Sequence, residues 1–332
     1  MSMTALFRAF RIHADDKGSH RAGIEEIGLD ALAPGEVVIK TAYSSVNYKD
    51  ALAGTGTGKI LRRFPMVGGI DAAGYVAASR DPAFKEGDAV LCTGSGLSET
   101  RDGGYSEYVR LESKWTIPLP SGLTLREGMI LGTAGFTAAL SLYRMEQSGQ
   151  CPEMGPVVVT GATGGVGMLA LDILTRAGFE AHAITGKLDR LDFLTALGAR
   201  QVISRDGLHW GQRPLEAATW AGAIDNVGDE MLAGLTRVIK PYGNIASAGL
   251  ARGPELHTTV MPFIIRGVSL LGIASAGTAR PIRDAIWQRL ANDWRPAHLD
   301  RICTREVGLD GLPQVFETML AGGSFGRTIV NF

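Results

Sequence analysis

The sequence predicts an α/β protein with two domains, and three observations carry that prediction. Short segments rich in β-branched residues, separated by glycine and proline, fill the first part of the chain, whereas strands alternate with helices after Pro156. A chain of 332 residues with 45% apolar content is long enough for two cores. Glycine supplies 44 of those residues without a triplet period, so we expect many tight turns and close backbone approaches.

The first domain is predicted to be a β-barrel or sandwich. Its strands are expected at residues 36–46, 71–79, 88–94 and 105–111. A long apolar helix then begins, with Thr124 as its N-cap and Glu127 in its first turns. That helix marks the start of a second domain.

The second domain is predicted to contain a parallel sheet. Strands are expected at residues 157–160, 180–185, 201–204 and 221–228, with helices at 167–178 and 189–199. Such alternation is typical of βαβ units. The tail offers helices at 281–293 and 312–322, a segment at 303–309 and a last strand at 327–332. Periodicity leaves open which domain the tail joins.

A glycine-rich turn follows the first strand of the second domain. Its glycines are Gly161, Gly164, Gly165 and Gly167, and an apolar helix follows at once. Glycines permit the sharp turn and bring backbone N–H groups close to a pyrophosphate at the positive end of the helix. The spacing departs from the standard dinucleotide pattern. A ligand-free turn and a methyltransferase loop are therefore alternatives.

The end of the next strand predicts the type of dinucleotide. An NAD enzyme would place a carboxylate there to accept from the ribose hydroxyls, but this chain has Thr185, Gly186 and Lys187, with Arg190 one turn later. A hydroxyl and a cation suit a 2′-phosphate, so NADPH is the predicted cofactor. In the alternative interpretation Lys187 and Arg190 form a solvated helix start beside Asp189.

Charge and hydropathy exclude several classes of protein. The chain has 33 basic and 34 acidic residues, which does not suit a nucleic-acid-binding surface. Arg8 and Arg11 interrupt the N-terminal apolar residues before a signal sequence could form. The longest charge-free run, between Glu127 and Arg144, is too short to span a bilayer. We expect a cytoplasmic protein with no nucleic-acid or membrane partner.

The candidate catalytic residues are polar groups rather than metal ligands. Three distant cysteines and six scattered histidines offer no ligand spacing, so no metal site is predicted. Asn47 and Tyr48 lie in the polar stretch 44–50 at a predicted strand end, and a second candidate stretch covers 68–71. Asn47 could donate to a substrate carbonyl, and Tyr48 offers a hydroxyl and a flat ring near a nicotinamide. Ordinary turn chemistry is the competing interpretation.

Several long motifs together resemble one enzyme family over nearly the whole chain. It is the acrylyl-CoA reductase family, in the zinc-independent, quinone-oxidoreductase-like branch of the medium-chain dehydrogenases/reductases. The motifs are SSVNYKDAL, FPMVGGIDAAG, GTAGFTAAL, VVVTGATGGVG, WAGAIDNVG, TTVMPFIIRGVSLLGI and GRTIV.

This resemblance implies a fold, an activity and an assembly. A GroES-like β-barrel domain, residues 1–125 and 269–332, would hold the substrate. A Rossmann-type doubly wound parallel-sheet domain, residues 126–268, would bind NADPH, and two copies would pair their sheets as a homodimer. The implied reaction is NADPH-dependent reduction of the 2,3-double bond of a short enoyl thioester, acrylyl-CoA to propionyl-CoA. Asn47 or backbone N–H groups would stabilise the enolate oxygen, and Tyr48 or water would supply the proton.

The resemblance also implies which positions contact the cofactor. They are Tyr48, Thr163, Gly164, Gly165, Val166, Thr185, Gly186, Lys187, Arg205, Leu250, Ile264, Ser275 and Gly323. Two of them depart from the family pattern. Lys187 stands where relatives often have arginine, which keeps the charge but loses a bidentate contact. Gly323 stands where relatives can present asparagine, so its contact would be through the backbone.

Two other functions remain open from the sequence. One is reduction of quinones or other activated alkenes, and the other is a nucleotide-binding sensor with little catalysis. A basic cluster of Lys59, Arg62 and Arg63 either meets coenzyme A phosphates or forms a solvated loop.

Overall fold

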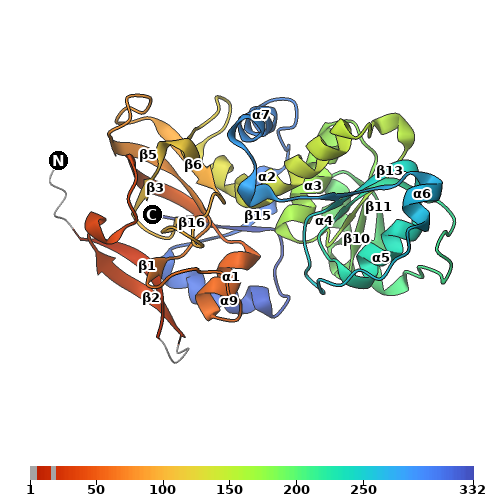
Figure 1. Ribbon diagram of the computed structural model, residues 1–332, viewed down its shortest axis with the longest axis horizontal. Helices are drawn as coiled ribbons and strands as arrows, with labels where there is room; N and C mark the ends of the chain where they lie inside the picture. Colours follow the sequence, from red (N-terminus) through yellow and green to blue (C-terminus); the bar gives the residue numbers. More distant parts are fainter. Residues whose placement is uncertain (1–5, 16–19) are drawn as a thin grey trace. The chain divides into compact units, whose positions relative to one another are not determined.

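The computed structural model describes residues 6–15 and 20–332, which form two compact units. Unit 1 contains the chain up to residue 133 together with residues 276–285 and 299–332, and unit 2 contains residues 134–275 and 286–298. In Figure 1 unit 1 carries the red to yellow part of the chain and its dark-blue end, and unit 2 the green and cyan part. The N-terminal segment, in which we expect no signal sequence, has its first residues outside the described part of the chain.

The main sheet of unit 1 is built from both ends of the sequence. Its order is β15-β16-β3-β5-β6-β8, and β7 also pairs with β3. The C-terminal strand β16 runs antiparallel to β3, with Val330 opposite Ser44. The strands are β3 (Val37–Ser45), β5 (Asp71–Ser79), β6 (Ala89–Thr93), β7 (Tyr108–Leu111), β8 (Ile117–Pro118), β15 (Cys303–Val307) and β16 (Arg327–Asn331).

A smaller sheet and two helices complete the core of unit 1. The hairpin of β1 (Phe7–Ala14) and β2 (His20–Ile27) pairs with β4 (Met66–Val67). Helices α1 (Tyr48–Thr55) and α9 (Leu312–Leu320) pack together. Phe10, Tyr105 and Phe316 are buried, with ring centroids 5.9 to 6.4 Å apart. Glycine at position 54 allows this packing, because a Cβ there would meet the Phe316 ring at 2.4 Å.

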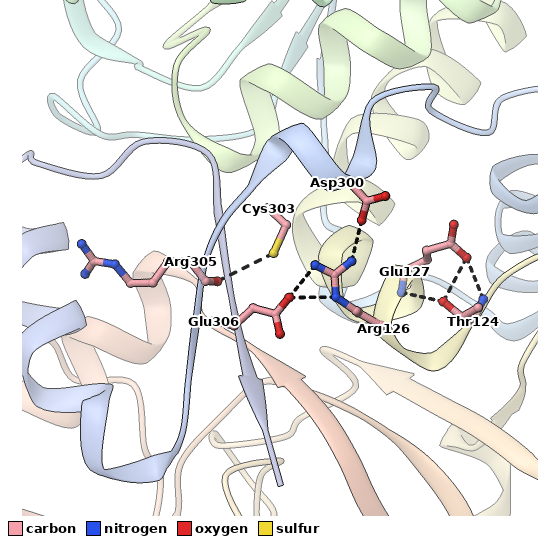
Figure 2. A network of polar contacts seen from close by, with 7 residues as sticks. All are labelled: Thr124, Arg126, Glu127, Asp300, Cys303, Arg305 and Glu306. Carbon is pink, nitrogen blue, oxygen red and sulfur yellow. Dashed lines mark hydrogen bonds and ion pairs between the residues drawn. The ribbon is translucent and has the colours of Figure 1, made fainter.

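A polar network joins the C-terminal tail to the first turn of a long helix, α2 (Leu125–Gln147). The Arg126 guanidinium donates to Glu306 from Nε at 2.8 Å and from Nη2 at 2.5 Å, and to Asp300 from Nη1 at 2.6 Å (Figure 2). Asp300 belongs to α8 (Leu299–Ile302) and Glu306 to β15. The expected N-cap is confirmed, because Thr124 Oγ1 accepts the Glu127 N–H at 3.2 Å. Arg126 thus contacts one Glu306 oxygen with two donors and Asp300 with a third, which ties α2 to both α8 and β15.

Helix α2 bends at Gly132. The φ and ψ angles there are +49° and −154°, outside the helical range, and the helix resumes beyond it. A Cβ at this position would lie 2.7 Å from both Asp71 Oδ2 and Ser45 Oγ. Both the backbone angles and the space therefore require glycine.

Unit 2 contains a parallel sheet with the order β11-β10-β9-β12-β13-β14. The chain starts at β9, moves outward to one edge, then returns to β12 and moves to the other edge. In sheets of this type ligands bind outside the carboxyl ends of the strands where the order reverses. The strands are β9 (Val157–Thr160), β10 (Ala181–Thr185), β11 (Ala199–Ser204), β12 (Trp220–Asp225), β13 (Ile239–Ser247) and β14 (Ser269–Gly272).

Helices connect the strands of unit 2. They are α3 (Gly165–Arg176), α4 (Leu191–Ala196), α5 (Asp229–Val238) and α6 (Met261–Arg266), while α7 (Arg280–Ala291) crosses from unit 1 into unit 2. Helix α3 packs on β9 and β10, and every residue from Gly167 to Leu174 is buried, so the helix is covered on all sides over two turns. In the described chain no helix is long and apolar enough to cross a membrane.

Candidate nucleotide and substrate sites

The glycine loop of unit 2 lies between β9 and α3. Gly161 has a φ of +60°, and the Gly164 N–H donates to the Gly161 carbonyl at 2.9 Å. A Cβ at Gly167 would lie 2.4 Å from that carbonyl, so only glycine lets α3 approach the strand this closely. Among residues 6–15 and 20–332, no side chain caps α3. Its first N–H groups, from Gly165 onward, are therefore available to an anion.

Buried polar groups from β12 hold the loop. Thr160 Oγ1 donates to Asp225 Oδ1 at 2.6 Å, and Asn226 Nδ2 donates to the Thr160 carbonyl at 2.9 Å. Asn226 Oδ1 is buried and accepts no hydrogen bond from any described residue. A buried acceptor without a donor costs free energy, and a ribose hydroxyl is one group that could satisfy it. The sequence prediction missed Asn226, although the WAGAIDNVG motif contains it.

A cationic corner lies at the ends of β10 and β11. Thr185 Oγ1 lies 3.3 Å from Thr163 Oγ1 and accepts the Lys187 N–H at 3.0 Å. The Arg205 guanidinium packs on Gly186, where a Cβ would lie 2.8 Å from its central carbon. Burial lowers the pKa of Lys187 from its ordinary value. Hydroxyl and cationic groups of this kind, close to the glycine loop, suit a phosphate on the adenosine ribose.

The other predicted cofactor residues of unit 2 are spread along the sheet. Leu250 follows β13 and is 64% exposed, and Ser275 follows β14 and accepts a hydrogen bond from Thr137 at 2.9 Å. Ile264 lies instead on α6 and is 69% exposed. Leu250 and Ser275 therefore share the carboxyl edge of the sheet with the glycine loop, whereas Ile264 belongs to a connecting helix.

The residues of the glycine loop and the cationic corner fit a dinucleotide. The uncapped helix suits a pyrophosphate, Asn226 offers an unpaired acceptor, and Lys187 with Arg205 supplies positive charge. Gly164 and Gly165, at the start of α3, carry no side chain that could cover its first N–H groups.

Asn47 and Tyr48 lie in unit 1 where β3 passes into α1. The sequence interpretation as a strand end was incomplete, because Tyr48 is the first residue of a helix and Asn47 is its N-cap. Tyr48 is 49% exposed, and its hydroxyl bonds to no described residue. The Asn47 amide is fully engaged: Nδ2 donates to Asp71 at 2.8 Å, and Oδ1 accepts from Arg327 at 3.2 Å. Tyr48 can therefore reach a ligand, whereas Asn47 is held by its neighbours.

Two carboxylates and one guanidinium are buried beneath Asn47. Asp71 accepts from Ser45 Oγ at 2.5 Å and from Thr133 Oγ1 at 2.6 Å. Arg327 donates to Ser45 Oγ at 2.7 Å, so Ser45 connects the two charged groups. Burial, followed by the nearby Asp71 charge, raises the pKa of Asp50 to about 7.

The sequence prediction missed Arg327 as a member of this cluster. It stands in the terminal GRTIV motif and is 3% exposed. Burial lowers the pKa of Arg327, and carbonyl groups of Ile130 and Val46 accept two of its hydrogen bonds. A lone arginine at the start of an apolar strand is the one signal that could have pointed to it.

Gly323 belongs to unit 1 and follows α9. Its N–H donates to the Thr318 carbonyl at 2.9 Å. Only the carbonyl of Gly323 is left for a ligand.

Within residues 6–15 and 20–332 no group of three or more His, Cys, Asp or Glu residues could hold a metal ion.

Comparisons with known proteins agree with this architecture. Residues 33–121 match a family model described as the alcohol dehydrogenase GroES-like domain, and residues 165–292 match one described as zinc-binding dehydrogenase. Acrylyl-CoA reductase AcuI of Ruegeria pomeroyi is 41% identical over 98% of this chain and 99% of its own. The chain belongs to the acrylyl-CoA reductase family. The predicted family and fold class, a GroES-like domain with a Rossmann-type parallel-sheet domain, are thereby confirmed.

Two solved structures of relatives were determined with nucleotides bound. The YhdH oxidoreductase of Salmonella enterica, in complex with NADP, is 42% identical with a TM-score of 0.94, covering 98% of this chain and 99% of that one. The YhfP protein of Bacillus subtilis, with NAD bound, is 44% identical with a TM-score of 0.95, covering 99% and 100%. Relatives of this chain are therefore seen with either nucleotide.

Proposed function

We propose that this protein is an NADPH-dependent reductase of the 2,3-double bond of a short enoyl thioester, with acrylyl-CoA as substrate and propionyl-CoA as product. The observation that carries the proposal is the cationic corner beside the glycine loop, in a chain 41% identical to an acrylyl-CoA reductase. Lys187 follows β10, where a carboxylate would favour NAD, and Arg205 packs beside it on Gly186.

Unit 2 would hold the cofactor through its backbone and its cations. The N–H groups of Gly165 and Val166 would bind the pyrophosphate, Thr163 and Thr185 would lie along the ribose, and Lys187 with Arg205 would bind the 2′-phosphate. The remaining proposed contacts are Gly164, Gly186, Leu250, Ile264 and Ser275 in unit 2, with Tyr48 and the Gly323 carbonyl in unit 1. NADPH supplies a hydride to the β-carbon of the substrate.

Unit 1 would supply the proton that the reaction needs. Electron density added at the β-carbon develops negative charge on the thioester oxygen, and the α-carbon must then be protonated. We assign the proton to the exposed Tyr48 hydroxyl, which no described residue engages. Asn47 has both amide ends occupied, so its proposed role is to position Tyr48 at the start of α1. Backbone N–H groups remain the donors for the oxygen.

Reduction of a quinone or another activated alkene is the alternative, because it needs the same hydride chemistry without coenzyme A. The two activities are separated by an NADPH-oxidation screen across enoyl-CoAs of increasing chain length, with the products identified by mass. The proposal expects propionyl-CoA from acrylyl-CoA at the highest efficiency. Stoichiometric NADPH binding without oxidation by any thioester, enone or quinone would point to the sensor function instead.

A homodimer in the cytoplasm is also part of the proposal. Strand β14 ends the sheet, and exposed apolar side chains lie on β14 (Leu270), on β13 (Tyr242) and at α6 (Val260, Met261 and Ile265). An exposed apolar patch at a sheet edge suits a second copy of the chain. All three cysteines are free thiols, which suits a reducing compartment.

A further inference from the structure

A cavity of about 430 Å³ opens in unit 1 between the segment before β3 and the loops around β4 and β7. Residues 31–34 form an apolar wall, and Arg63, Arg101 and Arg110 face it with a single carboxylate, Glu112. This volume lies in the range of small-molecule sites. Arg63 pairs with Asp102 behind the wall and Arg101 pairs with Glu112, so Arg110 is the lining cation that no carboxylate balances among the described residues.

The cavity wall is held in place by a buried carboxylate. Asp102 is 3% exposed and accepts hydrogen bonds from the Ala33 and Val67 N–H groups at 2.8 and 2.9 Å. Arg63 Nη2 donates to the same carboxylate at 2.9 Å, while its side chain remains 45% exposed. Arg63 is therefore fixed at the rim with part of its guanidinium open to solvent.

Glu112 does not neutralise the cavity. It pairs with Arg101 at 3.0 Å and also with Lys114, and the hydrogen bond from Lys114 holds the pKa of Glu112 below its ordinary value. The Arg101 guanidinium also lies over the Trp115 ring at 5.3 Å. The one acidic side chain of the lining is thus already shared by two cations.

Arg110 supplies positive charge that no carboxylate balances. Its Nε donates to the Gly35 carbonyl at 3.1 Å, and Arg80 Nη2 donates to that same carbonyl at 3.2 Å. Neither guanidinium pairs with a carboxylate in the described part of the chain. Two arginines that converge on one neutral oxygen favour an anion nearby.

The cavity is linked to the helix that begins with Tyr48. Lys49 pairs with Glu99 at 3.2 Å, and the Glu99 carbonyl accepts the Arg62 N–H at 2.8 Å. The next residue, Thr100, lines the cavity. The cationic cavity and the proposed proton donor therefore belong to one connected part of unit 1.

We propose that this cavity binds the terminal phosphate of a phosphoadenosine group, that of the coenzyme A thioester on which the proposed function rests. Arg110, with Arg63 and Arg101 beside it, would bind the phosphate dianion, and the apolar wall 31–34 would cover the adenosine. Coenzyme A and free inorganic phosphate both offer a phosphate dianion, so inorganic phosphate is the other ligand that this cavity could bind.

The test compares Arg110→Gln with Arg80→Gln. Both variants lose a donor to the Gly35 carbonyl, but only Arg110 lines the cavity. Arg110→Gln should raise KM for acrylyl-CoA about tenfold, as expected for loss of a charge-assisted phosphate contact, with KM for acrylyl-pantetheine and kcat unchanged. Arg110→Lys should restore part of the loss, and Arg80→Gln should match the wild type. Equal effects of Arg110→Gln on both thioesters would overturn the proposal.

A binding measurement separates this proposal from the proposed function. Adenosine 3′,5′-bisphosphate is titrated calorimetrically into the wild type and Arg110→Gln, with NADPH saturating so that the nucleotide site is filled. Weaker binding to the variant supports the cavity even if no thioester is reduced, whereas equal affinity overturns it. Inorganic phosphate is titrated in parallel. If phosphate binding depends on Arg110 and bisphosphate binding does not, the coenzyme A assignment is wrong.

Discussion

At the scale of single residues, burial decides which polar groups of unit 1 can meet a ligand. Asp71, Arg327 and Ser45 satisfy one another beneath α1, and this occupies both ends of the Asn47 amide. Tyr48 is the neighbouring side chain left exposed. Because a proton donor must touch its substrate, Tyr48 suits that role and Asn47 suits positioning.

Replacing the Tyr48 hydroxyl tests this assignment. Tyr48→Phe should lower kcat for acrylyl-CoA about 100-fold, the usual scale of a lost general acid, with KM little changed. Tyr75→Phe is the matched control, because Tyr75 is 51% exposed in the same unit. Steady-state kinetics on both variants measures the effect. An unchanged kcat in Tyr48→Phe would indicate that water, and not Tyr48, supplies the proton.

Lys187 should determine the choice of nucleotide. Lys187→Ser removes a cation from the proposed 2′-phosphate contact, so KM for NADPH should rise about tenfold while KM for NADH stays constant. Lys240→Ser is the control. Lys240 lies at the amino end of β13, whereas Lys187 and the glycine loop lie at the carboxyl ends of their strands. Equal changes with both nucleotides would contradict a phosphate contact.

Asp50 should make stability depend on pH. Its folded pKa of about 7 exceeds the ordinary value of 3.8, so the unfolded chain releases this proton at lower pH. The contribution of Asp50 is therefore complete below pH 3.8 and is lost as the pH rises to about 7. Asp50→Asn removes the titration. Urea unfolding should show that the free energy of unfolding of the variant rises relative to that of the wild type between pH 3.8 and about pH 7. A constant difference between the two proteins across this pH range would contradict the raised pKa of Asp50.

At the scale of elements, the bend in α2 connects helix geometry to the buried charges. Gly132 combines a positive φ with backbone placed against Asp71 and Ser45. The N–H of the next residue, Thr133, donates to Asp71 at 2.9 Å. A straight helix would withdraw this donor, so the bend is part of how the carboxylate is held.

Substitution of this glycine should be costly. Gly132→Ala adds a Cβ 2.7 Å from two oxygens in a backbone conformation that alanine disfavours, and we expect a loss of about 2 kcal/mol or more. In Gly128→Ala, four residues earlier in α2, the new Cβ meets side chains only at 3.4 Å or beyond and should leave stability equal or higher. Thermal unfolding compares them, and equal midpoints would contradict the account.

At the scale of the whole molecule, local patterns were predictable and distant partnerships were not. Strand β9, the glycine loop and α3 are adjacent in sequence, so apolar runs and glycine spacing predict them together. Arg327 and Ser45 are 282 positions apart, and no local pattern predicts that they meet. The β1–β2 hairpin was missed because β2, with the sequence HRAGIEEI, carries charge and no clear alternation.

We propose that this protein reduces a short enoyl thioester with NADPH. The most direct test of this proposal is the ratio of kcat/KM for acrylyl-CoA to that for a simple quinone, measured on the same preparation with NADPH. The account predicts that acrylyl-CoA is the better substrate and that propionyl-CoA accumulates as NADPH is consumed. Inertness toward acrylyl-CoA together with rapid quinone reduction would contradict it.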